Sequence, residues 1–106
     1  MNLRISENKF RFRITPEDLD MLLRGRDVDQ RVCIGAHCFT YRISPMAPEK
    51  HMTLEMAVAG FCLFVPRATL EELRDLGRSK TGVSVIQGAV DIALELDIKT
   101  QMRKAA

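Results

Sequence analysis

One stretch of the sequence, residues 8–19, passes from an alternating pattern directly into a helix-start signal. Over residues 10–14, three apolar side chains alternate with two arginines, and this period of two is typical of a strand with one face in a core. Thr15 is a suitable N-cap, and Pro16 suits the first helical position, where no amide hydrogen is needed. The sequence therefore predicts a strand that leads into a short amphipathic helix over about 16–24.

The same pattern returns 51 residues later without a gap. Under this offset, each predicted core position of the first half falls on an apolar residue of the second half: Leu3 on Leu54, Ile5 on Met56, Phe10 on Phe61, Phe12 on Leu63, Ile14 on Val65, Leu19 on Leu70, Leu22 on Leu73, Val32 on Val83, Ile34 on Val85, Phe39 on Val90, Tyr41 on Ile92 and Ile43 on Leu94. The alternative is that any two units of this kind look alike once they are slid into phase. We interpret the pattern as an internal duplication, in which each repeat completes its core only against its copy, and predict a single domain (1–106) of two repeats, about 1–50 and 52–102.

Alternating runs bounded by turn residues predict the strands and their hairpins. The expected strands are 2–6, 9–14, 31–34, 37–43, 52–56, 61–65, 83–86 and 89–99. The pair Gly35-Ala36 suits a tight hairpin turn and places Val32 opposite Phe39. Residues 26–30 are expected to form a polar loop.

A second helix is expected over about 69–76. Thr69 and Glu72 have the spacing of a capping box, and Gly77 is a suitable residue to end the helix. The last residues, 101–106, are expected to form a frayed tail.

Composition and charge limit the classes of partner. Sixteen basic residues against fourteen acidic ones give a net charge of only +2, and tryptophan is absent, so no bulk field favours nucleic acid or an anionic membrane. The start of the chain has no apolar segment of signal-peptide length, and nothing in the chain approaches a membrane span. Three cysteines without an export signal are expected to be free thiols. We therefore expect a cytoplasmic protein without nucleic-acid or membrane partners.

Eight short antiparallel strands need to protect their sheet edges, and closing the sheet does so. We therefore predict an α+β fold, an internally duplicated antiparallel β-barrel of about eight strands with two short helices outside it. In such a barrel the apolar faces lie under the helices, and alternation turns the following residues inward: Arg4, Arg11, Arg13, Arg42, Glu55, Cys62, Phe64, Asp91, Glu95, Asp97 and Lys99. The alternative is a two-layer arrangement of helices on an open sheet, which leaves the same charges on a solvated face.

The order of elements resembles that of the CYTH-like, or triphosphate tunnel, fold. That fold repeats a strand–helix–three-strand unit, and cutting this chain after its first strand gives the same order in both halves. The first fifteen residues also resemble an uncharacterised family of small bacterial proteins with an arginine-rich N-terminal strand pair. The matching residues are Leu3-Arg4-Ile5, Asn8 and Phe10-Arg11-Phe12-Arg13-Ile14-Thr15.

The CYTH resemblance implies a metal-dependent hydrolase of tripolyphosphate or a nucleoside triphosphate. Members have an E-x-E-x-K run on the strand before the first helix, where carboxylates hold a divalent metal and inward bases clamp the phosphates. Here Arg11 and Arg13 occupy that strand, and the similar run Glu95-x-Asp97-x-Lys99 lies on the last strand. Glu95 and Asp97 are therefore the candidate ligands for Mg²⁺ or Mn²⁺, and the alternative is that they line an exposed strand face.

Four arginines and a lysine are the candidates for binding an anion: Arg4, Arg11, Arg13, Arg42 and Lys99. Guanidinium groups match phosphate or carboxylate oxygens in pairs, and a recessed site strengthens each contact. The alternative is that the arginines pair internally with Glu55, Asp91, Glu95 and Asp97.

Cysteine and histidine residues give no strong signal of a metal or catalytic site. Cys33 and Cys38 are expected to face each other across a hairpin as reduced thiols, and their spacing is not that of a zinc ribbon even with His37 and His51 nearby. Cys62 is expected to pack in an apolar strand. No cysteine–histidine trio suited to catalysis is evident.

These observations favour a small module that binds an anionic small molecule or a protein partner without catalysis and without a cofactor. One alternative is a phosphohydrolase that needs Mg²⁺ or Mn²⁺. Another is an interaction or dimerisation module, with a homodimer built through an apolar edge at 59–65.

Overall fold

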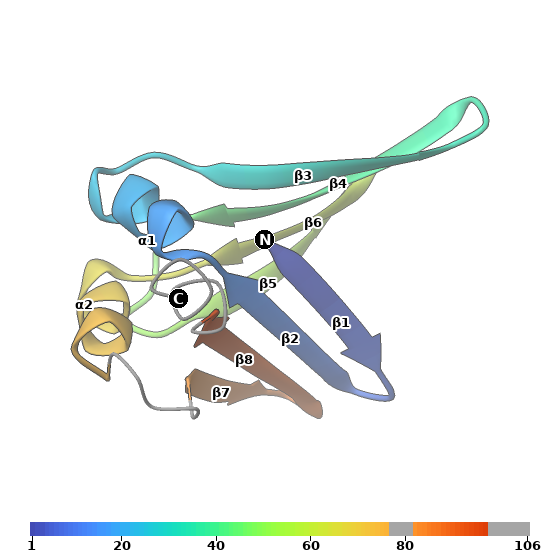
Figure 1. Cartoon of the computed structure of the whole chain (residues 1–106). Helices are drawn as coiled ribbons and strands as arrows, with labels where there is room; N and C mark the ends of the chain where they lie inside the picture. The colour runs from blue at the N-terminus through green and yellow to red at the C-terminus, as the bar shows by residue number, and fades with distance from the viewer. Residues whose placement is uncertain (77–81, 98–106) are drawn as a thin grey trace.

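The computed structural model describes residues 1–76 and 82–97. Its elements are β1 (Asn2–Ser6), β2 (Lys9–Ile14), α1 (Pro16–Leu23), β3 (Val28–Ile34), β4 (His37–Ser44), β5 (Thr53–Ala57), β6 (Gly60–Phe64), α2 (Arg67–Leu76), β7 (Val83–Gln87) and β8 (Val90–Leu96). They form two four-stranded sheets, sheet A in the order β1-β2-β8-β7 and sheet B in the order β3-β4-β6-β5. In Figure 1 both helices lie at one end of the molecule, and the sheets diverge toward the hairpin turns at the other end.

The local sequence signals around α1 act as predicted. The Thr15 hydroxyl accepts a hydrogen bond from the backbone N–H of Asp18, and the Asp18 carboxylate accepts one from the backbone N–H of Thr15, so the two residues form a capping box. Leu19 and Leu22 are buried. Gly25 follows the helix with a φ of +85°, a conformation that glycine adopts without steric cost.

The second helix begins two residues earlier than the predicted start at Thr69. Because α2 starts at Arg67, Thr69 lies within the helix, and its N–H donates to the carbonyl of Pro66 (3.0 Å). The predicted capping box of Thr69 with Glu72 is therefore wrong. Gly77 lies outside the described residues.

The hairpin of β3 and β4 has the predicted register, with Val32 opposite Phe39. However, β3 begins at Val28, which pairs with Ile43, so the expected polar loop at 26–30 is mostly strand. The strand extends this far because Val28 is half-buried and packs against the core. The paired length is seven residues per strand, against five in the hairpin of β7 and β8.

The six strand ladders form three corresponding pairs between the two halves, and two of these pairs match under the offset of 51. Phe10 pairs with Ile92 in the parallel ladder of sheet A, and its counterpart Phe61 pairs with Tyr41 in that of sheet B. The hairpins β1–β2 and β5–β6 match in the same way. The match fails for the hairpins β3–β4 and β7–β8. Val83 pairs with Leu94, just as Val28 pairs with Ile43, so Val83 corresponds in the structure to Val28. The predicted correspondences of Val32 with Val83 and of Ile34 with Val85 are therefore wrong. The duplication itself stays a prediction.

The predicted closed, antiparallel barrel is wrong. The central pair of each sheet, β2 with β8 and β4 with β6, is parallel, and each described sheet ends in two edge strands. Edges β5 and β7 are linked by the amide of Gln87, which accepts from the N–H of Leu54 (2.8 Å) and donates to its carbonyl (2.9 Å). The β5–β6 segment is also no apolar edge at 59–65, since β6 lies inside sheet B.

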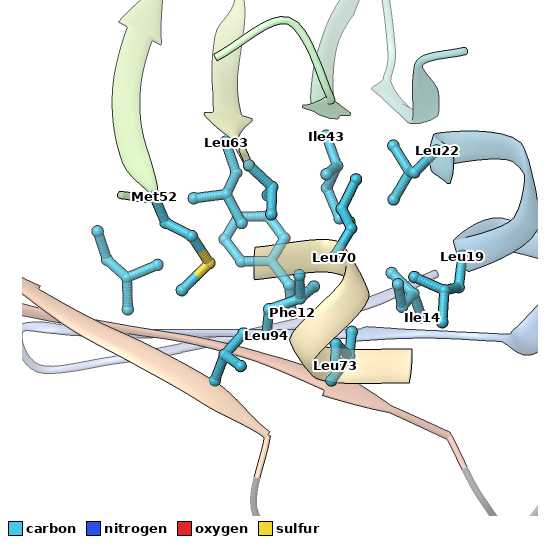
Figure 2. Packing of buried hydrophobic residues seen from close by; sticks show 13 residues of the cluster. Phe12, Ile14, Leu19, Leu22, Ile43, Met52, Leu63, Leu70, Leu73 and Leu94 are labelled. Atoms are coloured by element: carbon cyan, nitrogen blue, oxygen red, sulfur yellow. The ribbon is translucent and has the colours of Figure 1, made fainter. Parts of the chain in front are cut away.

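The core lies between the two sheets and includes both helices (Figure 2). Its buried residues are Phe12, Ile14, Leu19, Leu22, Ile43, Met52, Leu63, Val65, Leu70, Leu73, Val83, Ile92 and Leu94. Because the apolar faces of the sheets meet here, their charged faces point away from the core. Neither described helix is long and apolar enough to cross a membrane.

Candidate anion-binding site

The outer face of sheet A gathers most of the predicted arginines. We call it the arginine face and define it as Arg4, Lys9, Arg11, Arg13, Asp91 and Glu95, which share one face by their register on β1, β2 and β8. The prediction that these arginines line a barrel lumen is wrong. They lie on the outside because Phe12 and Ile14, which alternate with them, fill the space between the sheets.

Two arginines of this face are cross-strand partners. Arg4 on β1 is directly opposite Arg11 on β2, and like charges at such positions destabilise a sheet unless a counter-charge is present. Among the described residues, neither Arg4 nor Lys9 forms an ion pair. Asp91 is the register neighbour of Lys9 on this face, so the part of the arginine face nearest the β1–β2 turn has an excess of positive charge: Arg4 and Lys9 against one carboxylate.

Glu95 neutralises the other half of the face. Its Oε2 lies 3.4 Å from Nε of Arg11, and its Oε1 lies 3.3 Å from Nη2 of Arg13. The Glu95 side chain is only 17% exposed, so these pairs are better shielded from solvent than ordinary surface pairs. The internal pairing considered as an alternative thus exists for two of the arginines.

A hollow of about 460 Å³ adjoins Arg4 and Lys9. It is lined by Arg4, Ile5, Ser6, Lys9 and Arg11. Its volume lies within the roughly 300–1,000 Å³ of small-molecule sites. Lys9 was not among the predicted candidates, although it shares the strand parity of Arg11 and Arg13 and could have been found from that alternation.

The two remaining predicted bases do not join this site. Arg42 lies on the outer face of sheet B, where its Nη2 is 3.4 Å from Oδ2 of Asp29, and both side chains are about half exposed. Lys99 lies outside the described residues. At the offset of 51, sheet B has Glu55, Gly60, Cys62 and Phe64 in place of Arg4, Lys9, Arg11 and Arg13, so this strand arrangement does not itself require basic residues.

The predicted metal ligands Glu95 and Asp97 lie at the end of β8 and just beyond it. Both oxygens of Glu95 face arginines, and Asp97 follows the last residue of β8, with its N–H donating to the carbonyl of Ile14 (2.7 Å). In the part of the chain that the structure describes, no group of three or more His, Cys, Asp or Glu residues is placed to hold a metal ion. The assignment of Glu95 and Asp97 to Mg²⁺ or Mn²⁺ stays a prediction.

The cysteines differ from the expectation of three free thiols. Cys33 and Cys38 are directly opposite each other, as predicted, but they form a disulfide, and a disulfide cannot supply thiolate ligands for zinc. Cys62 is a free thiol on the outer face of sheet B. Burial raises the pKa of the Cys62 thiol, and Asp27 and Glu55 raise it further while Arg42 lowers it, so Cys62 is a poor nucleophile at neutral pH.

Comparison with known proteins identifies one family. The model described as "Family of unknown function (DUF7009)" matches residues 1–104. No curated protein and no solved structure shows a significant match to the chain.

Proposed function

This chain belongs to the DUF7009 family, and we propose that it is a non-catalytic module that binds a multivalent anion on the arginine face of sheet A. The ligand class is a small polyanion, such as a di- or triphosphate group. Arg4, Lys9 and Arg11 bind it in the hollow beside the β1–β2 turn. The observation that supports the proposal best is the direct pairing of Arg4 with Arg11 without a carboxylate for Arg4 among the described residues.

The spacing of the three bases favours an anion with more than one charged group. Arg4 and Arg11 are cross-strand neighbours, and Lys9 lies two residues along the same strand, roughly 7 Å from Arg11. Side chains of this length reach a common ligand from both directions. Each charge-assisted hydrogen bond adds about 1.5–3 kcal/mol before the cost of ordering the side chains.

Glu95 is paired with both Arg11 and Arg13. It also competes with the ligand for Arg11, because it is the only carboxylate paired with that guanidinium among the described residues. The proposal includes no bond-breaking step, since this carboxylate is already engaged by two cations and is not available as a general base.

A thermal-shift titration with tripolyphosphate, and with orthophosphate as the singly bound comparison, tests the proposal. Binding to the folded state raises Tm with ligand concentration, and we expect a larger shift for tripolyphosphate. Arg4→Gln should lose most of this shift. It should leave the free protein as stable as the parent or more stable, by about 0.2–1 kcal/mol, because it removes a like-charge pair.

Arg42→Gln is the matched control, because it removes another exposed arginine, from the outer face of the other sheet. It should bind tripolyphosphate as the parent does. The proposal is wrong if no polyanion shifts Tm, or if Arg42→Gln loses as much of the shift as Arg4→Gln. Release of phosphate during the titration would instead support the hydrolase alternative.

A further inference from the structure

The outer edge of β3 offers unpaired backbone groups to a partner. β3 is an edge strand of sheet B. Cys33 and Cys38 are directly opposite each other with Cα atoms 3.9 Å apart, which identifies a pair without mutual backbone hydrogen bonds. By alternation, Asp29, Arg31 and Cys33 therefore direct their N–H and C=O groups toward the open edge, while Gln30 and Val32 bond to β4.

We propose that the protein forms a two-fold symmetric homodimer in which β3 pairs antiparallel with β3 of a second copy, centred on Gln30. In this register Asp29 of each copy is opposite Arg31 of the other. Both residues are exposed in the single chain. Because the backbone groups of both Asp29 and Arg31 point outward, this pairing gives each of them a hydrogen-bond partner on the second copy.

Charge complementarity favours this register over its two neighbours. Only residues whose backbone N–H and C=O groups point outward can form hydrogen bonds across the dimer. The allowed registers therefore differ by moving the centre of the β3–β3 pairing one residue at a time along β3. Centring on Arg31 places that arginine opposite itself, and centring on Asp29 places that aspartate opposite itself, and like charges directly opposite are unfavourable. Centring on Gln30 gives two opposite-charge pairs instead. It also places Arg31 of the second copy beside Asp29 of the first, which already forms an ion pair with Arg42.

The apolar face of the β3–β4 hairpin supports the same arrangement. Val32 and Phe39 are each 36% exposed and Ile34 is 73% exposed, and all three lie on the face that is continuous with the core. In the proposed register Val32 of one copy is opposite Val28 of the other, so the exposed valine gains an apolar neighbour. The result is a continuous eight-stranded sheet in which an exposed edge strand is covered.

The other edge of sheet B is arranged differently. At β5, the amide of Gln87 already occupies both backbone groups of Leu54. A second copy could not pair with β5 there without displacing Gln87. The two edges of sheet B therefore differ in a way that leaves β3 as the one suited to dimerisation.

Reciprocal charge variants test the register directly by sedimentation velocity. The parent should sediment as a dimer, whereas Asp29→Arg alone and Arg31→Asp alone each place like charges in contact and should raise the dissociation constant by about tenfold or more. An equimolar mixture of the two variants should dimerise again. In the mixed dimer one copy is basic at both positions and the other copy is acidic at both, so every contact is complementary.

Asp20→Arg and Arg24→Asp are the matched controls, because they reverse the charges of an exposed ion pair on α1 and should leave the dimer intact. Arg31→Pro should give a folded monomer, since it removes an outward N–H and no bond to β4. Circular dichroism of each variant checks that it is folded.

A monomeric parent, or a dimer that all three β3 variants leave unchanged, would overturn the proposal. Failure of the mixture to dimerise would refute the register centred on Gln30, and with it the proposal as stated. A monomeric parent that still binds an extended peptide along β3 would mean that another protein occupies this edge. Arg4→Gln should leave the dimer unchanged, so the dimer and the anion site can fail separately.

Discussion

Gly60 is the residue whose replacement tests the parallel centre of sheet B most severely. Its φ is +147°, and a Cβ atom added there would lie 1.7 Å from the carbonyl oxygen of Thr40, its partner in the ladder of β4 and β6. The obstructing atom is backbone in the middle of a sheet, so it cannot turn aside as a side chain would. In Gly60→Ala, the start of β6 has to move away from β4.

The expected cost follows from two contributions. An L-residue held in this region of φ costs about 1–3 kcal/mol. Moving β6 also lengthens the hydrogen bond from the N–H of Thr40 to the carbonyl of Ala59, now 2.8 Å, and one more of the ladder, at about 1 kcal/mol each. The free energy of unfolding should therefore fall by about 3–5 kcal/mol, which for a chain of this size lowers Tm by roughly 10–40 °C.

Urea denaturation of Gly60→Ala beside Gly88→Ala measures this cost against a matched control. Gly88 also has a positive φ, +62°, but a Cβ there meets nothing within 4 Å, so only the backbone cost of about 1–2 kcal/mol applies. If both variants lose the same stability, the close approach of β6 to β4 does not exist in solution, and the reasoning is refuted.

Three further outcomes follow from the same structure. Glu95→Gln should strengthen tripolyphosphate binding several-fold in isothermal titration calorimetry, because it frees Arg11 and Arg13 from a competing carboxylate; weaker binding, or the loss of a bound Mn²⁺, would instead favour the metal assignment. Gln87→Leu should lower the free energy of unfolding by about 1–2 kcal/mol, since it removes both hydrogen bonds to Leu54, and no change in urea denaturation would show that the link between β5 and β7 is absent in solution. For Cys62, the raised pKa in the folded state means that the unfolded thiol ionises first as pH increases, so stability should fall above the ordinary thiol pKa. Cys62→Ala should remove this fall, and native Cys62 that reacts with iodoacetamide at neutral pH as fast as the unfolded chain does would contradict the shift.

The sequence predicted those features that depend on neighbouring residues. The cap at Thr15, the end of α1 at Gly25 and the register that sets Val32 opposite Phe39 all follow from a few adjacent positions. Hairpins and caps are local, so their chemistry is visible in the order of residues. The alternation around Arg11 likewise predicted correctly that its strand has one buried face and one charged face.

The sequence did not predict which faces meet or which strands are central. Alternation assigns Phe12 to the core and Arg11 to the opposite face, but it does not show whether that core lies between two sheets or between the helices and the wall of a barrel. The parallel pairs join strands about 20 and 82 residues apart in the chain, as with Tyr41–Phe61 and Phe10–Ile92. A closed barrel was therefore predicted where the two sheets stay separate.

The backbone conformation of the β1–β2 turn differs from that of the β5–β6 turn, and aligning the two halves at an offset of 51 does not show this difference. Asn8 has a φ of +56° at the β1–β2 turn, whereas at the β5–β6 turn the positive φ falls one position later, at Gly60. Lys9 therefore occupies the place where sheet B requires glycine. This difference allows the side chain of Lys9 at the edge of the hollow. The alignment of the two halves alone does not indicate this difference.

A titration of the ¹⁵N-labelled protein with tripolyphosphate, followed by NMR, tests the central claim most directly. The backbone amide signals of Arg4, Ser6, Lys9 and Arg11, and the guanidinium signals of the two arginines, should move together and saturate. The signals of Arg42 and its neighbours on sheet B should not move. Signals that move equally on both sheets, or none that saturate, would contradict an anion site on the arginine face.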